Sequence, residues 1–93
     1  MKLSWGEAKR ARNLADRGVD FADAAFVFGG PTLEFEDDRR DYGERRIVCV
    51  GFLRGRMTVL VYVQRGAVRR IVSIRKANDR EQKIYQALLA QPG

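Results

Sequence analysis

The side chains best suited to chemistry lie in one stretch near the end of the chain, RRIVSIRKANDREQKIY at residues 69–85. The stretch begins as an alternating strand and continues into a helix-like pattern. Because side chains alternate along a strand, one face of it should carry Arg69, Ile71, Ser73 and Arg75. A face buried wholly in the core would not contain Ser73 and Arg75. Arg75 therefore either reaches water at the end of the strand or points across the sheet at a phosphate.

In the helical part, Glu81 and Tyr85 are four residues apart and so lie on the same side of a helix. Glu81 has a simpler explanation as the partner of Asn78 in a capping box, and Tyr85 as an edge residue with a buried ring and a hydrated hydroxyl. If the helix packs on the sheet, both side chains should lie near Arg65 and Arg75. A carboxylate, a phenol and two guanidinium groups could bind and strain an RNA phosphodiester, in which the 2′-hydroxyl attacks phosphorus while cations stabilise the transition state.

The composition limits how such a site could work. The chain has no histidine, so proton transfer near neutral pH would fall to Lys, Glu, Asp or Tyr. With one cysteine, Cys49, the sequence argues against a transition-metal site and a disulfide, although it is compatible with a carboxylate-bound magnesium. Cys49 lies in an apolar run and should be a buried, inert thiol. No Walker loop, dinucleotide fingerprint, HExxH or GxSxG motif occurs, and no cofactor is expected.

The distribution of charge points to a polyanionic or acidic partner. The formal net charge is +6. Residues 1–44 hold seven Lys/Arg against ten Asp/Glu, whereas residues 45–93 hold eleven against two. Fourteen of the 18 basic residues are arginine, whose planar fork suits bidentate contact with phosphate or carboxylate. This pattern favours nucleic acid, an acidic protein or both as partners; the alternative is a solvated basic surface.

The length and hydropathy predict one cytoplasmic domain. At 93 residues the chain can build one modest core, and we expect a single domain over residues 1–93. No apolar run approaches the roughly 18 to 20 residues that a membrane span needs. The N-terminal segment MKLSWGEAK also lacks the apolar core of a signal peptide.

The first third of the chain predicts two helices. A capping box formed by Ser4 and Glu7 would begin the first helix, which should end just before Gly18. Asp20 would then cap a second helix, and Gly29-Gly30-Pro31 would end it.

From residue 32 the pattern changes to β-branched and aromatic residues, which predicts strands. The expected strands cover residues 33–36, 45–53, 57–65 and 68–76, with hairpin turns at Arg54-Gly55 and Arg65-Gly66. The two middle strands lack polar alternation, so they should be central and covered on both faces.

A last helix should begin at Asn78, with an apolar face formed by Ala77, Ile84, Ala87 and Leu88. The predicted fold is therefore α+β, with two N-terminal helices, a four-stranded antiparallel sheet and a C-terminal helix.

Several spaced motifs resemble the BrnT family of type II toxins. They are W-x-E-x-K from Trp5, N-x(4)-G-V-x-F from Asn13, R-x-x-Y-G-E-x-R from Arg39, V-Y-x-x-R-G from Val61, and R-I-V-S-x-R-K-A-x(3)-E-x(3)-Y from Arg70. They occur in the family's order, and the resemblance covers about residues 4–86.

The resemblance implies a RelE-like fold and a stress-response ribonuclease that suppresses translation. It also implies a BrnA-like ribbon-helix-helix antitoxin that neutralises the toxin, in a complex that binds the operator DNA of their operon. In the implied metal-independent site, Arg65 and Arg75 hold the phosphate. Candidates for proton transfer or substrate positioning are Lys76, Glu81 and Tyr85.

Two departures from the family pattern leave other functions open. Asp16-Arg17-Gly18 stands where members commonly read K-H-G, and Val63 stands where a threonine is usual. If the missing histidine contributes to cleavage, the protein would be a binding module that pairs with an antitoxin and helps to regulate the operator. A general nucleic-acid-binding domain is a third hypothesis, and its affinity should fall steeply with salt.

Overall fold

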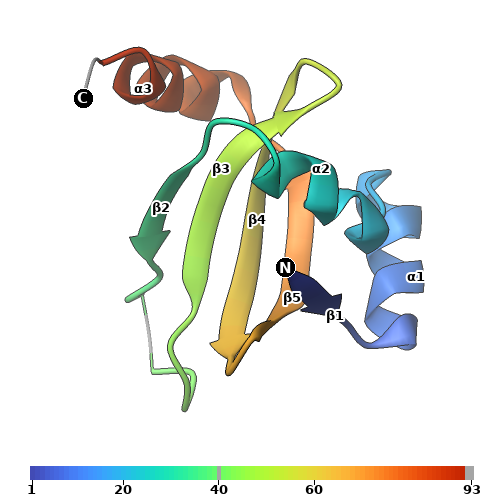
Figure 1. Ribbon diagram of the computed structural model, residues 1–93. Coiled ribbons are helices and arrows are strands. Elements are labelled where there is room, and N and C mark those ends of the chain that lie inside the picture. The colour runs from blue at the N-terminus through green and yellow to red at the C-terminus, as the bar shows by residue number, and fades with distance from the viewer. Residues whose placement is uncertain (40, 92–93) are drawn as a thin grey trace.

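The computed structural model describes residues 1–39 and 41–91 as helices packed on one mixed β-sheet (Figure 1). The strands are β1 (Lys2–Ser4), β2 (Leu33–Glu36), β3 (Ile47–Leu53), β4 (Arg56–Arg65) and β5 (Val68–Lys76). The helices are α1 (Glu7–Arg17), the 3₁₀ helix η1 (Phe21–Asp23), α2 (Ala24–Phe28) and α3 (Asp79–Leu89). Arg40, in the charged stretch after β2, and Pro92-Gly93 lie outside the described residues. The predicted α+β class is confirmed.

The sheet has five strands in the order β1-β5-β4-β3-β2. The prediction of four antiparallel strands was wrong because it missed the fifth strand, β1. β2, β3, β4 and β5 form the expected antiparallel meander, whereas β1 pairs in parallel with the first part of β5. β1 has three residues, too few for an alternating pattern to stand out in the sequence.

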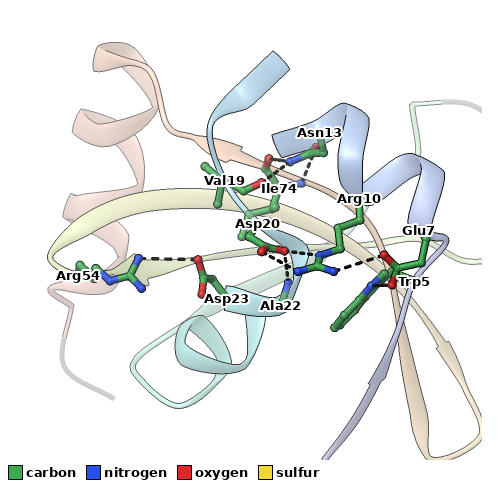
Figure 2. Close-up of polar contacts among 10 residues, drawn as sticks. All are labelled: Trp5, Glu7, Arg10, Asn13, Val19, Asp20, Ala22, Asp23, Arg54 and Ile74. Atoms are coloured by element: carbon green, nitrogen blue, oxygen red, sulfur yellow. Dashed lines mark hydrogen bonds and ion pairs between the residues drawn. The ribbon is translucent and has the colours of Figure 1, made fainter. Parts of the chain in front are cut away.

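The presence of β1 also explains why the predicted start of α1 was wrong. Ser4 pairs with Arg70 as a strand residue, and Gly6 is the N-cap of α1 without a side-chain cap. Glu7 instead accepts a hydrogen bond from the indole Nε1 of Trp5 at 2.9 Å (Figure 2). The end of α1 was predicted correctly, since Gly18 adopts the left-handed conformation with φ 72°.

The second helical segment begins and ends where the sequence predicted. Asp20 caps it by accepting a hydrogen bond from the backbone N–H of Ala22 at 3.0 Å, and Gly29 follows its last residue. The segment is divided into η1 and the short α2. Arg10 of α1 donates two hydrogen bonds to Asp20, at 2.7 and 3.0 Å, which ties the two helical segments together (Figure 2).

Two apolar clusters cover the two faces of the central strands, as their continuous apolar sequence predicted. The helix-pair cluster, on the face covered by η1 and α2, includes Phe21, Val27, Cys49, Leu60, Ile71 and Ile74. The α3 cluster, on the other face, includes Val48, Val50, Met57, Val59 and Ala77, with Tyr85 and Leu89 packed against it. Burial raises the pKa of the Cys49 thiol to about 12, which keeps it protonated, as expected of an inert thiol.

A β-bulge in β5 changes which of its side chains share a face. Val61 of β4 pairs with Ser73, but the next residue, Tyr62, pairs with Ile71, so Val72 has no partner on β4. The prediction that Arg69, Ile71, Ser73 and Arg75 share one face was therefore wrong. Ile71 lies in the helix-pair cluster, whereas Ser73 and Arg75 face the other side of the sheet.

The orientation of α3 also differs from the predicted one. Asn78 and Glu81 form the expected capping box. However, Ile84 and Leu88 are 51% and 44% exposed, while Tyr85 and Leu89 contact the sheet. The helix turns Glu81, Tyr85 and Leu89, at intervals of four residues, toward the sheet, so its apolar pattern alone gave the wrong face.

None of the helices in the described part of the chain is long and apolar enough to span a membrane.

Gly51 of β3 leaves no room for a side chain beside Val27 of α2, and it provides a test of this packing. A Cβ at this position would lie 2.7 Å from the Cγ1 of Val27, which is fully buried. We expect Gly51→Ala to lower the free energy of unfolding by about 1 to 3 kcal/mol because the core must shift to admit the methyl group. Urea denaturation measures this, with Gly29→Ala as the control, since its Cβ would make only ordinary contacts. Equal stabilities for the two variants would contradict the packing described.

Candidate active site

A cleft of about 300 Å³ opens between β2, the end of β5 and α3. Its floor is formed by Val48, Val59 and Val61 of the central strands. The sheet register places Phe35, Val48, Val61 and Ser73 in one row across this floor. Arg75 lies in the adjacent row, opposite Val59, and Glu81 and Tyr85 approach from α3. The cleft thus collects three of the five predicted site residues, Arg75, Glu81 and Tyr85.

Arg75 and Glu81 form a forked ion pair at the centre of the cleft. The Nη1 and Nη2 atoms of Arg75 donate to the two carboxylate oxygens of Glu81, each at 2.7 Å. Oε1 of Glu81 also accepts from the backbone N–H of Asn78 at 2.9 Å, within the capping box. The two explanations considered for Glu81, helix cap and site residue, therefore describe one arrangement.

This arrangement sets the charge of both groups. The hydrogen bonds from Arg75 lower the pKa of Glu81 to about 2, although burial opposes the shift. The hydrogen bond to Glu81 raises the pKa of Arg75. At neutral pH Glu81 is therefore an ionised carboxylate of low basicity, better suited to orienting the guanidinium than to removing a proton. Arg75 keeps further N–H groups with which to contact a phosphate.

Tyr85 supplies an aromatic surface and a hydroxyl at the same place. Its ring stacks on Phe35 of β2, with centroids 6.0 Å apart and an interplanar angle of 29°. Its hydroxyl makes no hydrogen bond to residues 1–39 or 41–91, so it remains able to bond to a substrate. The hydroxyl-bearing side chain of Ser73 lines the cleft beside it.

A second arginine, Arg39, lines the cleft on the β2 side and was missed by the sequence reasoning. It binds the buried Asp37 through two hydrogen bonds of 2.8 Å, which lower the pKa of Asp37 to about 2. The positive charge of Arg39 acts to lower the pKa of Arg75, because both face the same space. The motif that begins at this residue, R-x-x-Y-G-E-x-R, could have indicated Arg39 as a site residue.

Two predicted site residues lie elsewhere, which corrects the predicted cluster. Lys76 lies on the opposite face of β5 from Arg75, in a pocket lined by Gly18, Val19 and Asp23. Arg65 lies at the other end of β4, where it binds Glu44 at 2.8 Å. Arg65 is six positions along β4 from Val59, the residue opposite Arg75, a span of roughly 20 Å.

The two departures from the family pattern also lie outside the cleft. Arg17 ends α1 and lines a pocket with Arg12, Asn13 and Val72 on the helix-pair side. Val63 is buried in β4, where it pairs with Arg70. Within the described residues, no group of three or more His, Cys, Asp or Glu side chains is placed to hold a metal ion.

Comparison with known families identifies a matching family model. A family model described as "Ribonuclease toxin, BrnT, of type II toxin-antitoxin system" matches residues 5–81. The match includes Arg39, Arg75 and Glu81 of the cleft and ends before Tyr85. No curated protein matches the chain.

The lowered pKa of Glu81 predicts how acid affects the fold. Because this pKa falls from its ordinary 4.5 to about 2, the ion pair stabilises the fold fully above pH 4.5 and loses its effect as the pH falls toward 2. Glu81→Gln should be less stable than the wild type at pH 7, and the difference should shrink between pH 4.5 and 2. Urea denaturation across this range measures it.

Glu7→Gln provides the control, since Glu7 is an exposed carboxylate of α1. This variant should follow the wild-type pH dependence. A constant stability difference between Glu81→Gln and the wild type from pH 7 to pH 2 would contradict the role of the ion pair.

Proposed function

The chain belongs to the BrnT family of ribonuclease toxins of type II toxin-antitoxin systems, and we propose that it is an endoribonuclease whose active site is the cleft between β2, β5 and α3. It acts as one domain over residues 1–93, in the cytoplasm, where RNA cleavage inhibits translation. The observation that carries the proposal is the forked Arg75–Glu81 pair beside the Tyr85 hydroxyl, in a cleft that also receives Arg39.

In the proposed reaction, the 2′-oxygen of a ribose attacks the adjacent phosphorus and the bond from phosphorus to the 5′-oxygen breaks. The products are a 2′,3′-cyclic phosphate and a 5′-hydroxyl. Arg75, oriented by Glu81, donates hydrogen bonds to the non-bridging phosphate oxygens as negative charge develops on them. Arg39 adds positive charge from the opposite wall.

Tyr85 is proposed to position the RNA and to donate a proton toward the leaving oxygen. Its ring and that of Phe35 offer a surface on which a base can stack. Glu81 acts mainly as a positioning residue. When the N–H groups of Arg75 donate to the phosphate, Glu81 loses part of the hydrogen bonding that lowers its pKa. It then becomes a better acceptor for the 2′-hydroxyl proton.

The family implies an antitoxin protein as partner and RNA as substrate. We propose that the antitoxin is a BrnA-like ribbon-helix-helix protein and that the complex binds operator DNA. The alternative, an inactive binding module, was based on Arg17 in place of a family histidine. Since Arg17 lies on the helix-pair side, its side chain does not line the proposed cleft, which favours the active enzyme.

The central prediction concerns cleavage by the purified protein. It should cut single-stranded RNA in the presence of EDTA, because the proposed mechanism uses only side chains of the chain itself. Arg75→Ala should reduce the rate by about a hundredfold or more, since it removes the main donor to the phosphate. A gel-based cleavage assay with an end-labelled RNA measures both.

Two further variants make this assay specific to the cleft. Arg12→Ala removes an arginine of α1 and should leave the rate near that of the wild type. Arg65→Ala should also keep a rate near that of the wild type, because Arg65 is paired with Glu44 at the far end of β4 and does not line the cleft. If Arg65→Ala were as impaired as Arg75→Ala, the site would have to include both ends of the strand. Cleavage lost in EDTA and restored by magnesium would overturn the metal-independent mechanism.

Growth measurements distinguish an active ribonuclease toxin from an inactive binding module. Expression of the chain alone should arrest growth, expression of Arg75→Ala should not, and co-expression of the protein encoded by the adjacent reading frame should restore growth. The physical reason is that Arg75→Ala removes the main donor to the phosphate. Formation of a complex between this variant and the adjacent gene product shows that it still folds. Harmless expression of the wild type, together with a tight complex with the adjacent gene product, would instead support the binding module.

A further inference from the structure

Asn13 joins α1 to β5 through its side-chain amide (Figure 2). Its Nδ2 donates to the backbone carbonyl of Ile74 at 2.8 Å and to that of Val19 at 3.0 Å. Its Oδ1 accepts from the backbone N–H of Ile74 at a longer 3.4 Å. The amide thus bonds to both peptide groups of Ile74, in the way that a neighbouring strand would.

This contact falls where β5 lacks a neighbouring strand on one side. β1 pairs only with residues 68–70 of β5, so the later residues of the strand have β4 alone as a partner. Ile74 is fully buried, and buried backbone N–H and C=O groups are costly when they lack a partner. Asn13 supplies the partner that β1 is too short to provide.

The position of Ile74 gives this contact a consequence for the cleft. Ile74 lies between Ser73 and Arg75, two residues beyond the bulge at Val72. At a bulge, the face on which the following side chains lie depends on how the backbone is held, and a shift of one residue reverses it. Holding the backbone at Ile74 therefore directs Ile74 into the helix-pair cluster and its two neighbours into the cleft.

We propose that Asn13 is a positioning residue of the ribonuclease site: by bonding to both peptide groups of Ile74, it fixes the direction in which Arg75 and Ser73 enter the cleft. It touches no substrate itself, because it bonds to the edge of β5 and does not line the cleft. Its effect on rate rests on the proposed function, whereas its effect on Arg75 can be measured without RNA.

The test compares Asn13→Ala with Arg10→Ala. Arg10→Ala removes the ion pair between α1 and Asp20 but leaves the hydrogen bonds from Asn13 to β5 in place. Both variants should be less stable than the wild type. At a temperature where both remain folded, Asn13→Ala should lower kcat by about ten- to a hundredfold with a smaller change in KM, since a small displacement of a catalytic group is costly. Arg10→Ala should keep kcat within about twofold of the wild type.

A second readout reports on Arg75 directly. Carbon NMR of the Glu81 carboxylate during an acid titration measures how well Arg75 is placed against it. In the wild type and in Arg10→Ala the pKa of Glu81 should be about 2, and in Asn13→Ala it should rise toward the ordinary 4.5. This readout decides the proposal even if the wild-type protein cuts no RNA, in which case the proposed function alone would fail.

Asn13→Asp provides a second variant if Asn13→Ala does not fold. It keeps the size and the acceptor for Ile74 but cannot donate to the two carbonyls when ionised, so it should show the same losses. An unchanged kcat and an unchanged Glu81 titration in a folded variant would overturn the proposal. So would equal effects of Asn13→Ala and Arg10→Ala, or a loss of kcat without a change at Glu81.

Discussion

The forked ion pair between Arg75 and Glu81 is the interaction on which the candidate site depends. It joins the end of β5 to the first turn of α3, a helix without a fully buried residue among those described. The side chains of Arg75 and Glu81 are only 35% and 20% exposed, so removal of either partner would leave a charge that water cannot fully solvate. The pair therefore both attaches α3 to the sheet and orients the guanidinium of Arg75.

The pair can form only because the backbone of β5 changes faces before it reaches Arg75. With regular alternation, Arg75 would share a face with Ile71 and point into the helix-pair cluster, where a charge would be costly. The bulge at Val72 turns Arg75 to the α3 side and keeps both Ile71 and Ile74 in the core. One strand thereby serves an apolar core on one side and a polar cleft on the other.

Local signals predicted most of the elements, and long-range contacts account for the errors. β2 and β5 were predicted with their observed bounds, and the Asn78 cap and the Gly18 terminator were correct, because each depends on neighbouring residues. β1, the bulge and the orientation of α3 depend on partners far along the chain, such as Arg70 for Ser4 and Arg75 for Glu81. Lys76 directly follows Arg75, so strand alternation already predicts that it lies on the opposite face, as the structure shows. Arg65 lies at the other end of β4, and proximity to a hairpin does not specify which end of a sheet carries the site.

The arginines near the cleft are already paired, and this shapes how RNA can bind. Arg75 and Arg39 are held by Glu81 and Asp37 through short hydrogen bonds, so each pair has little net charge to attract RNA from a distance. Long-range attraction must therefore come from basic side chains that make no ion pair with another described residue, such as Arg70 and Arg80. The paired arginines contribute orientation instead, because a guanidinium fixed by a carboxylate loses little conformational entropy when it meets a phosphate. In such a site, attraction of the nucleic acid and recognition of the scissile phosphate are carried by different arginines.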